Sequence, residues 1–371
     1  MTDTHAARAL LGEFAARTGL EPPARTPNRY LWTDAFAVCT LLGLGDEAAR
    51  SLALRLIDLV HHTLGRHRGD DGRTGWLSGL SDEEGALHPT AGGLRIGKPL
   101  AERRPGERFD DRLEWDRDGQ YFHYLTKWMH ALCRASAVTG DPVHAARAAE
   151  LAKAVHPAFV PAPGRMHWKV SIDLSRPLVA SMGQHDPLDG LVTYAEVDAA
   201  SGADLSVESA DLAAMLSGVR LATDDPLGTG GLLFDAVRIA ALTAGGRASL
   251  GSLLVPVLEA ALAGTAAFAR SGTLRRPAGD RLAFRELGLA VGLHGLERIR
   301  SEFAASPAMF AECDRLHGQL VAFEAYGTLA GVIEAFWLEP RNRATSTWND
   351  HREINEVTLA ASLAPAGFLA V

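Results

Sequence analysis

Apolar residues recur at helical spacing along nearly the whole chain, with polar residues on the opposite faces. The pattern predicts about twelve helices, most of them joined by short loops with Gly or Asp-Pro. These helices span residues 4–19, 29–43, 46–65, 119–139, 141–155, 187–198, 205–221, 229–244, 248–270, 281–304, 313–338 and 349–363. Strand-like alternation is confined to short stretches, the best being 165–174. The sequence therefore predicts an all-α fold.

Two long connections, residues 66–118 and 156–186, interrupt the helical pattern. Loops of this length inside a compact domain are usually functional or disordered. Together they contain Trp, His and Met, which disordered segments lack. We therefore expect both loops to be ordered and to cap one end of a helical body. Since no linker, charge run or internal repeat divides the chain, we expect residues 1–371 to form a single domain.

Composition narrows the functional class. A chain of 371 residues that is 47% hydrophobic can bury a large core, and its net charge of −8 argues against nucleic-acid binding. No run of eighteen apolar residues and no signal-peptide layout is found, which predicts a cytoplasmic protein without a membrane span. The spacing of Cys39, Cys133 and Cys313 within apolar patterns indicates small buried side chains, not disulfides or a thiolate metal site.

Large polar and aromatic residues concentrate in "EWDRDGQYFHYLTKW" (114–128). Asp116 or Asp118 can cap the helix expected to begin near Gly119. The polar residues that follow form one stripe at spacings of three and four: Gln120, His123, Tyr124 and Lys127. If these groups were buried without water, each would need a hydrogen-bond partner from the protein. We therefore expect the stripe to face a water-filled cavity. The alternative is an ordinary helix with a capped start.

Two earlier segments offer further binding residues. Trp32 and Asp34 open the second predicted helix, where they can contact a sugar; alternatively Trp32 is core and Asp34 complements the helix dipole. The loop "HPTAGGLRIGKPL" (88–100) places Arg95 and Lys98 beside glycines, which suits an anion such as a carboxylate or phosphate. An ordinary turn with solvated charges is the alternative.

Residues 166–190 supply a fourth group of candidates: His167, Lys169, Gln184, His185 and Asp186. The Asp-Pro pair at 186–187 is also typical of a helix start, which explains the aspartate but not the two residues before it.

Trp348 and His351 lie at the start of the last predicted helix. They can return to a shared site, or Asn349 or Asp350 caps the helix and His351 is solvated. No HExxH, HxH or CxxC spacing, phosphate-binding loop, dinucleotide fingerprint or GxSxG elbow occurs, so we expect neither a metal nor a cofactor.

This helix count, with polar and aromatic residues gathered in loops, resembles the (α/α)6 toroid of the six-hairpin glycosidase superfamily. That superfamily includes inverting glycoside hydrolases and sugar 2-epimerases. The resemblance implies a funnel at one end of the toroid and a small saccharide substrate. It also implies a role for His351, because the 2-epimerases have a catalytic histidine near their last helix.

Two enzyme chemistries fit these candidates, and the first is our principal expectation. Inverting glycoside hydrolysis needs an acid and a carboxylate base about 6.5–9.5 Å apart, for which Asp116 and Asp186 are the pair. Epimerisation needs two bases on opposite faces of a carbon, for which His185 and His351 are the pair. A non-catalytic helical binding or scaffold protein is the third possibility.

The charge of the substrate is a separate expectation. Four basic residues stand among the candidates and favour an anionic saccharide: Arg95, Lys98, Lys127 and Lys169. The sequence does not indicate an oligomeric state.

Overall fold

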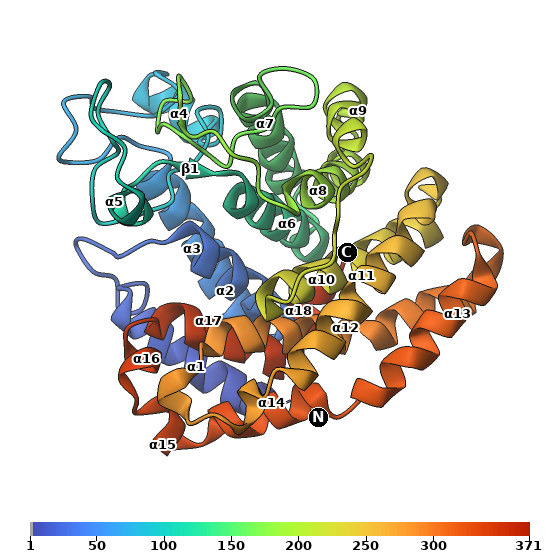
Figure 1. Ribbon diagram of the computed structural model, residues 1–371. Helices are drawn as coiled ribbons and strands as arrows, with labels where there is room; N and C mark the ends of the chain where they lie inside the picture. Colours follow the sequence, from blue (N-terminus) through green and yellow to red (C-terminus); the bar gives the residue numbers. More distant parts are fainter. Residues whose placement is uncertain (1–2) are drawn as a thin grey trace. The chain divides into compact units, whose positions relative to one another are not determined.

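The computed structural model describes residues 3–371 (Figure 1). Every helix predicted from the sequence is present, so the predicted all-α fold is confirmed. The chain divides into two compact units, residues 15–219 (the central unit) and residues 1–14 with 220–371 (the terminal unit). The boundary falls inside the first helix, α1 (Thr4–Arg17). The single-domain assignment stays a prediction.

The central unit is built around one helix, α6 (Phe122–Thr139), which packs against three others. Those neighbours are α2 (Leu31–Gly43), α7 (Pro142–Phe159) and α8 (Asp186–Ser201). The remaining helices are α3 (Glu47–Leu64), α4 (Asp82–Leu87), α5 (Asp111–Asp116) and α9 (Ser206–Met215). Local signals fix several ends: the Asp141 carboxylate accepts the Val143 amide at the start of α7, and Gly140 ends α6 at φ 74°.

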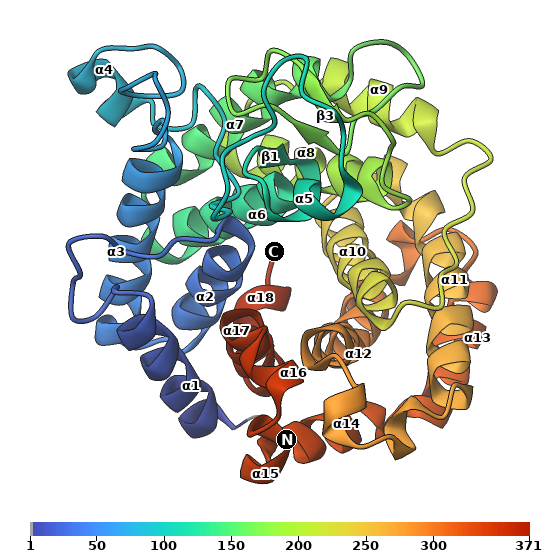
Figure 2. The ribbon, with the colours of Figure 1, turned by 60° about the vertical axis from the view of Figure 1, so that its left-hand side comes forward.

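Three short strands tie the long loops of the central unit together (Figure 2). They are β1 (Gln120–Tyr121), β2 (Lys169–Val170) and β3 (Pro177–Val179), paired antiparallel in that order. The predicted strand at 165–174 contains β2. The two long loops are ordered, as expected, and both views show them beside the ends of α6 and α8.

The terminal unit packs α12 (Ala283–Ala305) against α10 (Pro226–Ala244), α14 (Leu329–Leu338) and α17 (Arg352–Leu363). Its other helices are α11 (Gly251–Arg270), α13 (Cys313–Ala322), α15 (Pro340–Arg343), α16 (Ser346–Asn349) and α18 (Ala366–Leu369). The predicted helix 313–338 is interrupted, since a 3-10 turn at Phe323–Tyr326 separates α13 from α14.

Glycines let α10 and α12 approach closely. A Cβ on Gly230 would lie 2.2 Å from the carbonyl oxygen of Gly288, and one on Gly292 would lie 2.8 Å from the carbonyl oxygen of Gly230. Neither contact tolerates a side chain, because both neighbours are backbone atoms. The core of this unit therefore depends on backbone contact as well as side-chain packing.

The length and composition of a helix do not show whether its apolar surface packs inside the protein or contacts a membrane. Within residues 3–371, three segments are long and apolar enough to cross a membrane by length and composition: Pro226–Ala244, Gly251–Arg275 and Cys313–Leu338. In the structure 72%, 50% and 39% of their apolar windows are buried inside the protein, so α10 uses most of its apolar surface in packing. The absence of a membrane span stays a prediction. Two cysteines are buried as predicted, but Cys313 is exposed because it begins α13.

Candidate functional site

The first long loop of the central unit, residues 66–118, is held together by Asp118, which is fully buried. Its carboxylate accepts hydrogen bonds from Arg95 Nη1 at 2.6 Å and Arg68 Nη1 at 3.1 Å. It also accepts three backbone amides, including that of Gly97 at 3.0 Å. Arg95 is buried and donates in addition to two backbone carbonyls. Arg95 thus braces the first long loop against the end of α3, and Asp118 does not cap α6.

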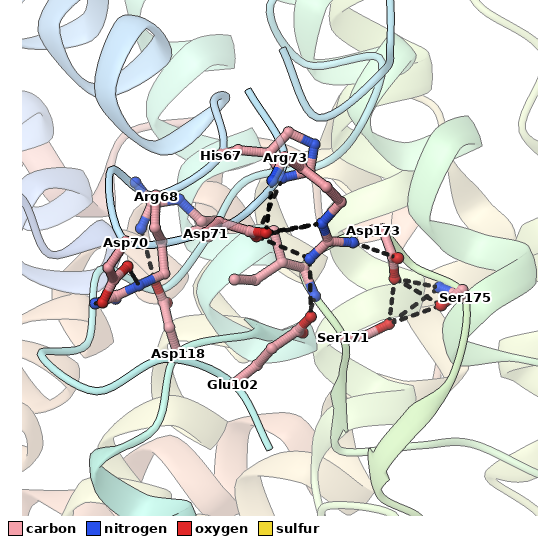
Figure 3. Close-up of polar contacts among 12 residues, drawn as sticks. His67, Arg68, Asp70, Asp71, Arg73, Glu102, Asp118, Ser171, Asp173 and Ser175 are labelled. Atoms are coloured by element: carbon pink, nitrogen blue, oxygen red, sulfur yellow. Dashed lines mark hydrogen bonds and ion pairs between the residues drawn. The ribbon is translucent and has the colours of Figure 1, made fainter. Parts of the chain in front are cut away.

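A second polar cluster joins this loop to the second long loop, residues 156–186 (Figure 3). The Arg73 guanidinium binds Asp71 at 2.9 Å, Glu102 at 3.0 Å and Asp173 at 2.6 Å, so one side chain joins three chain segments. Burial of Asp173 would raise its pKa, but hydrogen bonds from two serine hydroxyls outweigh that effect and lower the pKa to about 2. Asp173 is therefore ionised over the physiological pH range.

Two predicted site residues, Gln120 and Lys169, are internal. The Gln120 side-chain oxygen accepts the Leu94 amide hydrogen, and its nitrogen donates to two backbone carbonyls. Both ends of the amide group are therefore used to hold loops in place. Lys169 is fully buried, and its ammonium binds the Glu114 carboxylate at 3.0 Å and two carbonyls. Neither side chain is available to a ligand, because burying it required these partners.

Above this framework three rings stack nearly parallel. Tyr121 comes from β1, His123 from the first turn of α6, and Trp168 from the residue before β2. The Tyr121 centroid lies 5.2 Å from Trp168 and 5.5 Å from His123, with interplanar angles of 22° and 21°. The β1–β2 pairing produces this arrangement, since it sets Tyr121 opposite Lys169 and brings the adjacent Trp168 alongside. We call these three rings the aromatic platform.

Further rings meet the platform edge-on. Trp115 of α5, half-exposed, lies 5.0 Å from Trp168, and Tyr124 lies 4.7 Å from His123. The Tyr124 hydroxyl shares a 2.5 Å hydrogen bond with the Tyr30 hydroxyl. Burial raises the pKa of both phenols, that of Tyr30 to about 12, so both are protonated at neutral pH. The cluster offers partly exposed aromatic surface and polar hydrogens together, which suits a hydroxylated ligand.

The protonation state of His123 follows from its neighbour. The Trp168 indole N–H donates to His123 Nδ1 at 3.2 Å. An indole nitrogen can only donate, so Nδ1 carries a lone pair and the ring hydrogen is on Nε2. Burial and, to a smaller extent, the charge of Lys127 lower the pKa of His123 to about 4, which keeps the ring neutral at pH 7. His123 Nε2–H is therefore a hydrogen-bond donor with no partner among residues 3–371.

Asp186 lies next to this ring, at the first residue of α8. One carboxyl oxygen is 4.0 Å from His123 Nδ1, and the other, Oδ2, is buried without a hydrogen-bond partner in the described chain. Burial raises the pKa of Asp186 to about 7, the negative charge of Asp189 adds to the rise, and Lys127 opposes it. Asp186 does not cap α8, whose N-cap residue is His185 with no side-chain cap bond.

Lys127 forms an ion pair with Asp189. Its ammonium lies 2.6 Å from Asp189 Oδ1, while Thr126 Oγ1 donates to Asp189 Oδ2 at 2.5 Å. Three of the four basic residues expected to recognise an anionic substrate are therefore paired with internal carboxylates. Lys98 is the exception: it is half-buried, lies 5.4 Å from the Tyr30 ring centroid and has no ion pair among residues 3–371.

Asp116, the expected partner of Asp186 in hydrolysis, lies near a different part of the cluster. It is exposed at the end of α5 and does not cap α6, whose N-cap residue is Tyr121. Its charge raises the pKa of Tyr121 and opposes the lowering of the pKa of Lys98 by burial. The structure thus places Asp116 beside Tyr121 and Lys98, and Asp186 beside His123.

Several other predicted residues belong to the protein interior. Trp32 stacks on Phe36 at 4.0 Å and is core. Asp34 is buried, with an ion pair to Arg29 at 3.2 Å; burial raises its pKa to about 6, and Arg29 opposes the rise. His167 is also buried. Residue type alone did not reveal this burial, and a role in ligand binding for these three residues stays a prediction.

The candidates at the two helix starts are placed differently. Gln184 is exposed and His185 half-buried, directly before Asp186. Trp348 and His351 belong to the terminal unit, where Trp348 is buried against Trp337 and His351 is exposed beside Phe284. Neither Asn349 nor Asp350 caps α17, whose N-cap residue is His351, so the expected cap is wrong, whereas His351 is exposed as that alternative expected. The pairing of His185 with His351 stays a prediction.

Four rings that build the cluster were not among the predicted site residues: Tyr30, Trp115, Tyr121 and Trp168. Tyr121 falls within the predicted helix 119–139, whereas it lies in β1 and is buried. The available signal was the position of Trp168 in the predicted strand beside His167 and Lys169. Within residues 3–371 no cluster of three or more His, Cys, Asp or Glu side chains is arranged to hold a metal ion.

Comparison with known proteins gives matches in structure only. No protein-family model and no curated protein matches the chain. A sugar epimerase from a ruminal bacterium aligns with a TM-score of 0.44 at 11% identity, over 80% of this chain and 76% of that one. A cellobiose 2-epimerase from Bacillus thermoamylovorans aligns with a TM-score of 0.45 at 10% identity, over 87% and 86%. Identity this low concerns the fold and assigns no residue of this chain.

Proposed function

We propose that this protein is a carbohydrate-active enzyme that moves a proton at a carbon next to the carbonyl of a small saccharide, as sugar epimerases and isomerases do. The observation that carries the proposal is Asp186. Its carboxyl group is buried, has an unpartnered oxygen and a pKa near 7, and lies beside partly exposed rings. A group of this pKa both accepts and returns a proton at neutral pH.

The neighbours of Asp186 suit the same chemistry. When a base removes a proton next to a carbonyl, negative charge develops on the carbonyl oxygen. The Nε2–H of neutral His123 is a donor that can stabilise such an oxygen without itself being a strong acid. The aromatic platform offers faces on which a sugar ring can pack, with the phenols of Tyr30 and Tyr124 nearby. Asp186 would remove the proton and return it to the carbon of the former carbonyl, which gives a ketose, and His123 would bind the oxygen. An epimer would need a second base on the opposite face, for which His185, the residue before Asp186, is the candidate.

Inverting hydrolysis remains a second candidate because of Asp116. In that reaction Asp186, protonated near neutrality, would be the acid, and the exposed Asp116 carboxylate would activate water. Asp116 is one of the smaller causes, after burial, that raise the pKa of Tyr121, which supports a second carboxylate near the aromatic cluster.

One experiment separates the candidates. Reducing mono- and disaccharides are incubated with the enzyme in D2O and followed by NMR. Proton transfer predicts deuterium at the carbon next to the carbonyl and an epimer or ketose product, whereas hydrolysis predicts shorter sugars with inverted anomeric configuration. Asp186→Asn should reduce either activity by at least about 100-fold, while Asp198→Asn, an exchange later on the same helix, should not. Full activity in Asp186→Asn would refute the proposal, and no turnover of any sugar would favour a binding protein.

A further inference from the structure

The terminal unit contains a cavity of about 750 Å³ that the proposed function does not use. It lies between the second half of α12 and the segment formed by η5 (Phe323–Tyr326) and the start of α14. Its apolar lining includes Leu293, Leu296 and Phe323, and its polar lining includes His294 and Thr328. Its volume lies within the roughly 300–1,000 Å³ of small-molecule sites.

One polar group in this cavity is held in a fixed orientation. His294 Nε2 lies 2.6 Å from Glu334 Oε1, and the Ser362 hydroxyl donates to the same oxygen at 2.5 Å. Glu334 is buried, so its carboxylate depends on these two donors. In the neutral ring Nε2 therefore carries the hydrogen, and Nδ1 is an acceptor with no partner among residues 3–371. A ligand that meets His294 at Nδ1 must donate a hydrogen bond.

Charge at the cavity favours a cation. The lining carries two exposed acids, Glu297 and Glu324, and one base, Arg300. Arg300 is already used, because it lies 3.7 Å from Glu297 and donates to the Leu320 carbonyl. Glu324 has no ion pair in the described chain. Tyr326 adds an aromatic face, which attracts organic cations.

We infer that this cavity is a binding site for a small organic ammonium ion, with His294 accepting its N–H and Glu297 and Glu324 supplying the complementary charge. The inference is independent of the saccharide chemistry proposed for the central unit. Three features converge on it: a partly open cavity of suitable volume, an acceptor oriented by a buried carboxylate, and an acidic rim with one carboxylate that has no ion pair in the described chain.

The test uses three probes of similar shape and different charge: benzylammonium, benzyl alcohol and benzoate. Binding to the full chain is followed through the amide NMR signals of Gly327 and Gly331, which line the cavity. Benzylammonium should shift these signals at millimolar concentration, benzyl alcohol more weakly, and benzoate not at all. The double variant Glu297→Gln/Glu324→Gln should weaken benzylammonium binding by about fivefold or more, because two complementary charges are lost.

Two controls keep the inference falsifiable. Glu302→Gln removes an acid from the same helix outside the cavity and should leave the affinity unchanged. His294→Ala should weaken benzylammonium more than benzyl alcohol if Nδ1 accepts the ammonium hydrogen. The inference is overturned if benzoate binds as well as benzylammonium, if the double variant behaves like Glu302→Gln, or if none of the probes shifts the two glycine signals.

Discussion

Two carboxylates pair with Arg68: Asp118, which is buried, and Asp70, which is exposed. Removal of the Asp118 carboxylate should destabilise the protein far more than removal of the Asp70 carboxylate. Asp118 is fully buried, and Arg95, which it pairs with at 2.6 Å, is 7% exposed. Asp118→Ala leaves that guanidinium buried without its counter-ion and removes the acceptor of three amides. Breaking a buried pair in this way costs about 3–5 kcal/mol.

The matched control is Asp70→Ala. Asp70 also binds Arg68, at 2.7 Å, but its side chain is 57% exposed. Exposed pairs contribute only about 0.2–1 kcal/mol, so this variant should remain close to the wild type. The two variants remove the same functional group from the same ion-pair network, and they differ mainly in burial.

Urea unfolding followed by circular dichroism and by tryptophan fluorescence measures both variants. Asp118→Ala should lower the midpoint with an unchanged slope, and the circular dichroism and fluorescence transitions should shift together. The reasoning is refuted if the two variants lose stability equally, or if Asp118→Ala loses less than about 1 kcal/mol.

Three further predictions follow from the site. Trp168→Phe removes the donor to His123 Nδ1, so the nitrogen-15 spectrum of His123 should change from one tautomer to a mixture; an unchanged spectrum would show that the indole does not set the tautomer. Arg73→Met should destabilise the protein more at pH 6 than at pH 2, because the hydrogen bond from Arg73 is the main cause that lowers the pKa of Asp71. The contribution of a carboxyl with a lowered pKa is present above its unfolded value of about 4 and is lost as the pH falls through its folded value. Urea midpoints at both pH values check this, and an equal loss at both would contradict it. Lys98→Met should raise KM more for an acidic saccharide than for its neutral analogue, since Lys98 is the unpaired cation of the cluster; equal effects would remove the case for an anionic substrate.

The helices were predictable because each depends on local signals. Apolar spacing located α10 and α12, and Asp-Pro pairs marked the starts of α7 and α10. The break between α13 and α14 was not predictable, since the apolar pattern continues across residues 323–328 while the backbone turns there. Periodicity reports which face is buried, but it does not report whether the backbone stays helical.

The site was only partly predictable because pairing is not local. His123 and Tyr124 were expected to contact a ligand, and the structure leaves both partly exposed in the aromatic cluster. Gln120 and Lys127 looked equivalent to them in sequence, yet their partners, the Ile172 carbonyl and Asp189, lie 52 and 62 residues away. The raised pKa of Asp186 likewise depends on burial, which spacing cannot show.

The central claim is that Asp186 exchanges a proton near neutral pH, and its own titration tests this most directly. Carboxyl carbon-13 NMR on the full chain follows the side chain from pH 3 to pH 9, with Asp186→Asn identifying the resonance. The account predicts a midpoint at about 7. A midpoint near 4, the value of an ordinary exposed aspartate, would leave Asp186 ionised throughout and would contradict its proposed role in proton transfer.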